Sequence, residues 1–227
     1  RALALEGELA GRPLKLASGP VGLAWPGQMN ARDVDMVLGT PDSAQRFRIA
    51  RLDGELSPVG AAGTFDGADV MLAAVPLDIG GAGGEWRFAA GRLDLSESRF
   101  LVSDREARDR FTPLMARGAS LAMVDGRITA DAVLRHPASD IALAQIRIAH
   151  LLESGTGGAD FAVDGVTFAP GLQPVDLSPL ALGVVANVAG EVRGSGRIGW
   201  STAGVTSNGS FTTDSLDLAA AFGPVQG

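Results

Sequence analysis

Apolar and small residues occupy every even position between residues 182 and 200, whereas the odd positions carry the charged side chains Glu191, Arg193 and Arg197. Side chains alternate between two faces of an extended chain, so one face of this segment is apolar along its length. The pattern predicts a long strand over about residues 184–200, with a turn at the Gly-Ser-Gly of 194–196. The apolar face of this strand has unusually little bulk.

The same alternation recurs in short runs from Leu3 to Val163, which is typical of strands with one buried face. Asp-Gly and Asn-Gly pairs tolerate the positive φ of tight hairpin turns. Such pairs stand at residues 53–54, 66–67, 125–126, 164–165 and 208–209, and we predict turns there. The sequence therefore predicts an all-β fold. No low-complexity linker interrupts the pattern, so we expect one continuous unit over residues 1–227.

Two segments depart from the alternation. Ser103 and Glu106 have the spacing of a capping box, and the segment that follows is charged up to the next proline. This pattern predicts one short helix near residues 104–110. A second helical turn is predicted with Ser178 as its cap and Pro179 at its first position.

Composition narrows the choice of function. The chain has 31 glycines and 12 prolines, which disfavour long helices. Its net charge of −7 comes with dispersed arginines, whereas nucleic-acid binding needs a basic stripe. The absence of cysteine excludes disulfides, thiolate metal sites and a cysteine nucleophile.

Candidate catalytic and metal-binding groups are few. His136 stands four residues before Asp140 but directly precedes a proline in a loop-like stretch. His150 continues the parity of Ile146 and Ile148, so we interpret it as a partly buried structural residue. We find no phosphate loop, zinc motif or nucleophile elbow, and we predict no enzyme activity, no cofactor and no metal. The low aromatic content of 5% also disfavours a sugar-binding module.

The residues alone leave two architectures open. A β-sandwich or β-solenoid core is one, with glycine allowing strands to cross closely. The other is an open apolar groove, in which small residues such as Ala186, Gly190, Gly194 and Gly196 leave room for a ligand. The residue patterns by themselves favour the sandwich or solenoid.

A family resemblance changes this balance. The segments "LGVVANV", "GSGRIGW" and "VTSNGSFTTDSLDLAAAFGPV", with "GRLDLS" and "RIAHLL" upstream, resemble the YdbH family, which belongs with TamB and other AsmA-like proteins of Gram-negative envelopes. The resemblance implies an elongated, curved, antiparallel-rich sheet folded like a taco around a hydrophobic groove that carries phospholipid acyl chains. It also implies a periplasmic location, an inner-membrane anchor outside residues 1–227 and a small outer-membrane lipoprotein as partner. We expect this chain to be a middle length of such a conduit.

The alternation then predicts which side chains line the groove. They share the apolar face of the expected strands. The predicted lipid-contacting residues are Val184, Val188, Val192, Ile198, Trp200, Phe211, Ile128, Leu134, Ile146, Ile148, Phe161 and Val163.

Overall fold

The computed structural model describes residues 2–40, 44–71 and 75–220. These residues form one open antiparallel sheet of 15 strands with almost no helix. The strands are β1 (Leu3–Leu9), β2 (Arg12–Ser18), β3 (Val21–Leu23), β4 (Gly27–Leu38), β5 (Gln45–Ser57), β6 (Gly60–Met71), β7 (Leu77–Ala89), β8 (Arg92–Asp104), β9 (Leu114–Val124), β10 (Arg127–Arg135), β11 (Ala142–Leu151), β12 (Thr156–Phe168), β13 (Val185–Ser201), β14 (Gly204–Thr212) and β15 (Leu216–Ala220). The short helices α1 (Pro174–Leu177) and η2 (Pro179–Ala181) lie between β12 and β13.

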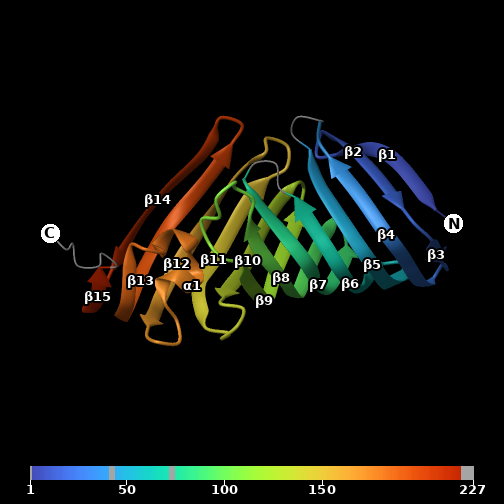
Figure 1. Ribbon diagram of the computed structural model, residues 1–227. Coiled ribbons are helices and arrows are strands. Elements are labelled where there is room, and N and C mark those ends of the chain that lie inside the picture. Colours follow the sequence, from blue (N-terminus) through green and yellow to red (C-terminus); the bar gives the residue numbers. More distant parts are fainter. Residues whose placement is uncertain (1, 41–43, 72–74, 221–227) are drawn as a thin grey trace.

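Nearly every strand pairs with the next one in the chain. The order runs β1-β2-β4-β5 and onward to β14 without a crossover, while β3 pairs with β4 and β15 with β13. The sheet curves along its length, and the N-terminal strands and the β14–β15 region stand at opposite ends (Figure 1). The predicted all-β curved sheet is confirmed. The described residues contain no second sheet, so the sandwich and solenoid alternatives do not hold for them.

A line of irregular residues crosses the middle of the sheet. Positive φ angles occur in the interior of β4, β6, β7, β8 and β9, at Asp33, Gly67, Gly81, Glu97 and Gly118. The pairing registers of β6 to β9 shift at these places. An extra residue in a strand bends it and increases its twist, so aligned bulges crease the sheet. Small side chains are buried beside this line, among them Ala68, Ala82, Ala116 and Ala119.

The curvature brings opposite strand ends together. The β1–β2 turn lies at the strand end opposite to the one that carries the turns after β9 and β11. Nevertheless Arg12 Nη1 donates a hydrogen bond to the carbonyl oxygen of Leu152 at 3.4 Å. A Cβ built on Gly126 would lie only 2.9 Å from the Cβ of Ala10. The β1–β2 turn therefore lies against the turns that follow β9 and β11.

The hairpin predictions hold at one position only. Asp125 and Gly126 form a tight turn with φ of 48° and 72°. The pairs at 53–54 and 208–209 lie inside paired strands, and those at 66–67 and 164–165 lie at register shifts. The predicted turn at 194–196 is also wrong, because these residues pair with β12 and β14. A residue that tolerates positive φ permits a turn, but strand pairing on both sides decides whether one forms.

The helix predicted near residues 104–110 is wrong. Strand β8 continues to Asp104, which pairs with Leu77, and the residues that follow form bends. The carboxylate of Asp104 accepts hydrogen bonds from the backbone N–H groups of Glu106 and Arg110, so a side chain closes a loop where a helix was expected. The helical turn predicted at Ser178 is correct: its hydroxyl accepts from the N–H of Leu180 at 3.3 Å.

Candidate functional site

The strand register aligns most of the predicted lipid-contacting residues on one face. Ile148 lies opposite Ala159, which in turn lies opposite Ile198. Ile146 lies opposite Phe161 in the same way. Directly opposed residues share a face, and we call this one the apolar face. Register and parity place these predicted residues on it: Ile128, Leu134, Ile146, Ile148, Phe161, Val163, Val192, Ile198, Trp200 and Phe211.

Two unbroken rows of apolar or glycine residues cross this face, one on each side of the crease. The first row runs from β1 to β9 through Leu5, Leu16, Met36, Phe47, Val70, Ile79, Val102 and Leu114. The second runs from β4 to β13 through Met29, Gly54, Gly63, Trp86, Leu95, Leu121, Ala130, Ile148, Ala159 and Ile198. The apolar face is therefore continuous over most of the sheet.

The opposite face is charged. Arg147 pairs with Asp131 across β10 and β11, with 3.5 Å between Nε and Oδ1. Arg197 pairs with Asp160 across β12 and β13, with 3.6 Å between Nη1 and Oδ1. These side chains are all more than half exposed. The sheet is thus amphipathic, with solvated ion pairs on one face and hydrocarbon on the other.

Aromatic rings fill the space above the glycines of the apolar face. A Cβ on Gly196 would lie 2.5 Å from Cζ of Phe161, and a Cβ on Gly194 would collide with the ring of Phe211. The two rings stack with centroids 6.2 Å apart and planes at 26°. The expectation that Gly194 and Gly196 leave room for a ligand is therefore wrong. Because these glycines have no side chain, the aromatic rings of neighbouring strands lie close against the sheet and fill the space above them.

Two predicted residues lie apart from this arrangement. Val184 precedes β13 and exposes 57% of its surface. Val188 is buried at 3%, and its backbone N–H and C=O both bond to the side chain of Gln173. Neither belongs to the open part of the apolar face.

His150 is a polar group on the apolar face. Trp200 Nε1 donates to His150 Nδ1 at 3.1 Å, so Nδ1 carries no proton and the ring is neutral. Its Nε2 is buried without a hydrogen-bond partner among the described residues. Burial is the main cause that lowers the pKa of His150, and the charge of Arg12 lowers it further. The ring is half-buried, in keeping with its predicted structural role.

The other candidates do not assemble into a reactive site. His136 lies in a loop, where Nδ1 contacts the hydroxyl of Ser139 at 2.8 Å. Among the described residues, no three His, Asp or Glu side chains are grouped so that they could hold a metal ion. Within those same stretches, none of the helices has the length and apolarity needed to cross a membrane.

Comparison of the sequence with known protein families identifies the family of this chain. The sequence model of the YdbH-like family, described as intermembrane phospholipid transport protein YdbH, matches residues 1–227. The chain belongs to the YdbH-like family. No curated protein and no solved structure matches. The family is one of lipid transport and not a known class of enzyme.

In this YdbH-like chain, one part of the apolar face is covered by a segment that sequence reasoning missed. Residues 170–184, here called the strap, contain α1 and η2. Leu172 and Leu177 of the strap pack in one cluster with Leu143 of β11 and Val166 of β12. Leu172 exposes 1% of its surface and Val166 exposes 5%. The prediction of a helical turn at Ser178 was the only sequence signal for this segment.

Proposed function

We propose that this chain is a length of a periplasmic bridge that conducts phospholipids between the inner and outer membranes. The acyl chains lie on the apolar face, and the charged face meets water. The family description supports phospholipid as the substrate class. The bridge mechanism rests on the arrangement of the sheet.

The observation that carries the proposal is the pair of continuous apolar rows. Each CH₂ removed from water contributes about 0.8 kcal/mol, so a hydrocarbon chain is held along the whole face. The residues of both rows are apolar or glycine, and a sliding acyl chain meets no polar side chain in them that would have to be desolvated. Affinity is therefore spread evenly, which favours movement along the rows.

The exposure of large apolar side chains supports an accessible face. Leu5 on β1 exposes 50% of its surface, and Phe211 on β14 exposes 60%. Val205, also on β14, exposes 48%. An extended apolar surface open to solvent marks a binding site more often than a core. The family description names phospholipid, and its acyl chains are the occupant that we propose for this surface.

The location and partners of the bridge follow from the family resemblance. We infer a periplasmic position, with an inner-membrane anchor outside residues 1–227 and a small outer-membrane lipoprotein at the far end. The charged face, together with the net charge of −7 of the chain, suits an aqueous compartment. The alternative function is that of a structural or protein-binding β-domain of the envelope that carries no lipid.

Native mass spectrometry of the purified chain tests the proposal. We expect bound species with the masses of phospholipids, and we expect Ile198→Asp to remove most of them. The matched variant Arg197→Asp changes the neighbouring residue on the charged face and keeps the lipid. A folded chain that carries no phospholipid, or one that loses it equally with both variants, supports the structural alternative.

A further inference from the structure

The strap crosses a part of the apolar face that would otherwise be open. Two of its leucines, Leu172 and Leu177, pack with side chains from β9, β11 and β12. The covered residues are Leu114, Leu143, Val163, Val166 and Phe168. Leu114 also ends the first apolar row. The strap therefore occupies the surface onto which that row leads.

Hydrogen bonds to the β8–β9 connection hold the strap down. We call residues 105–113 the latch loop. The backbone N–H of Thr112 donates to the carbonyl of Leu177 at 2.9 Å, and its hydroxyl donates to the carbonyl of Asp176 at 2.6 Å. The hydroxyl of Ser178 donates to the carbonyl of Arg110. These contacts join segments more than 60 residues apart in the chain. Strands β9, β10, β11 and β12 lie between the two segments in the chain and are neighbours in the sheet.

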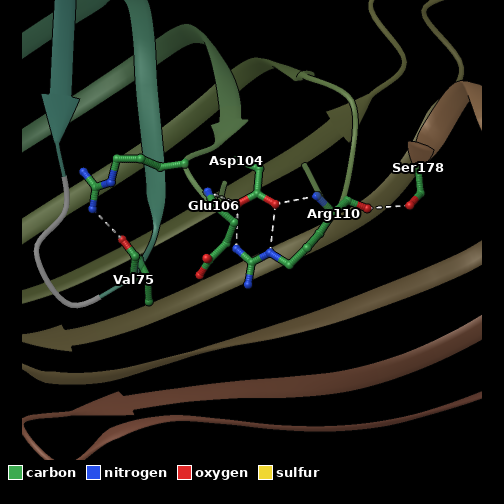
Figure 2. A network of polar contacts seen from close by, with 6 residues as sticks. Val75, Asp104, Glu106, Arg110 and Ser178 are labelled. Carbon is green, nitrogen blue, oxygen red and sulfur yellow. Dashed lines mark hydrogen bonds and ion pairs between the residues drawn. The ribbon is translucent and has the colours of Figure 1, made fainter. Parts of the chain in front are cut away.

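The latch loop is itself shaped by one carboxylate (Figure 2). Asp104, whose side chain is fully covered, accepts from the backbone N–H of Arg110 at 2.7 Å and from its guanidinium at 2.8 Å. The hydrogen bonds from Arg110 hold the pKa of Asp104 well below its usual range. The carboxylate stays ionised, so the loop presents Arg110 and Thr112 to the strap in a fixed position.

A glutamine anchors the other end of the strap. The amide nitrogen of Gln173 donates to the carbonyls of Ala169 and Val188 at 2.6 and 2.9 Å, and its oxygen accepts from the N–H of Val188 at 2.9 Å. The side chain thus takes the place of a neighbouring strand for Val188. Hydrogen bonds of this kind exchange readily with water, unlike a covalent or fully apolar attachment.

We propose that the strap is a lid over an acyl-chain site and opens to admit lipid. The site is formed by the residues that Leu172 and Leu177 cover, and these leucines imitate the hydrocarbon that replaces them. An acyl chain restores the apolar contacts that the departing leucines lose, so opening breaks chiefly the polar contacts of the latch loop. This inference rests on the proposed function and deepens it by assigning one site and its gate.

A reversible lock tests the lid. The chain has no cysteine, so Thr112→Cys with Ser178→Cys introduces one disulfide between the latch loop and the strap. The backbone N–H of Thr112 already donates to the carbonyl of Leu177, the residue before Ser178. A photo-crosslinking residue at Phe168 reports lipid under the strap, and one at Ile198 reports lipid on the open part of the apolar face. Both are placed in the full-length protein in cells. Asp160→Cys with Arg197→Cys, directly paired on the charged face, controls for oxidation.

We expect oxidation of the latch pair to reduce the lipid adduct at residue 168 at least fivefold, and reductant to restore it. The control pair leaves the adduct unchanged. Ser178→Ala, which removes one latch contact, raises the adduct at 168 without any disulfide. Equal adducts at 168 in the locked and reduced states overturn the lid, as does an adduct at 198 with none at 168 in any state. Loss of adducts at both positions in every variant refutes the proposed function itself.

Discussion

The strap-covered stretch and the C-terminal hairpin of β13 and β14 share one apolar face but differ in exposure. Under the strap, Val166 exposes 5% of its surface and Leu143 exposes 8%. On β14, Phe211 exposes 60% and Val205 exposes 48%. An open sheet buries an apolar side chain only where it bends onto itself, as beside the line of bulges, or where another segment covers it, because burial needs a second layer. Whether an apolar residue here is core or surface therefore depends on whether another part of the chain lies over it.

The largest expected contrast comes from placing a charge in each stretch. Val166→Asp puts a carboxylate under the strap without a partner, and we expect a loss of about 3–5 kcal/mol of folding stability. Ile198→Asp places the same group on the stretch that the strap does not cover, where Ile198 is only partly buried, and we expect a folded chain that no longer carries lipid. Urea unfolding and lipid binding together separate the two. Equal destabilisation by both variants would mean that Ile198 is also part of a closed core.

Truncating a strap leucine has the next largest effect. Leu172→Ala removes a side chain that exposes 1% of its surface, and a cavity of this kind costs about 2–5 kcal/mol. Leu182→Ala, at the exposed end of the strap with 75% of its surface accessible, changes stability by less than about 0.5 kcal/mol. Thermal unfolding of both variants measures the difference. Comparable losses would show that the strap is buried along its whole length.

A methyl group under an aromatic ring tests the packing of the uncovered stretch. Gly196→Ala forces the ring of Phe161 away from the sheet, and we expect a cost of about 1–3 kcal/mol. Gly7→Ala on β1 is the control, because a Cβ there meets nothing within 4 Å. If Gly196→Ala is as mild as Gly7→Ala, the ring does not lie against the glycine in solution.

The smallest expected effect is a pH dependence from His150. Its pKa is lowered in the folded chain from the ordinary 6.5, so the unfolded chain binds the proton more readily. Stability is then greatest above about pH 6.5 and decreases as the pH falls through that value towards the folded pKa. His150→Gln should flatten the dependence of folding stability on pH, measured by urea unfolding between about pH 7.5 and about pH 5. This range brackets the ordinary pKa of histidine. An unchanged slope would assign the pH dependence to other groups.

Strand content and the identity of the apolar face could be predicted from alternation alone, because burial on one face imposes period two on any strand. Residues such as Ile146, Ile148 and Ile198 therefore fall where the pattern indicates. The bulges could not be located in this way. Asp-Gly forms a turn at 125–126 but lies at a register shift at 66–67. Whether such a pair forms a turn or a bulge depends on how the neighbouring strands pair.

The strap lay beyond prediction for a different reason. Its position is decided by contacts between residues far apart in the chain, such as Thr112 with Leu177, and by the side chain of Gln173. Neither Thr112 nor Leu177 belongs to a recognisable motif. The helix predicted near 104–110 failed through the same kind of competition, since the spacing of Ser103 and Glu106 suits a capping box whereas Asp104 closes the loop instead.

Site-specific photo-crosslinking in cells tests the central claim most directly. A photoreactive residue at position 198 or 211 projects from the apolar face, whereas one at 197 or 208 projects from the charged face of the same two strands. The proposed function predicts phospholipid adducts at 198 and 211 and none at 197 and 208. Adducts on both faces alike, or on neither, would contradict the claim that phospholipid travels along the apolar face.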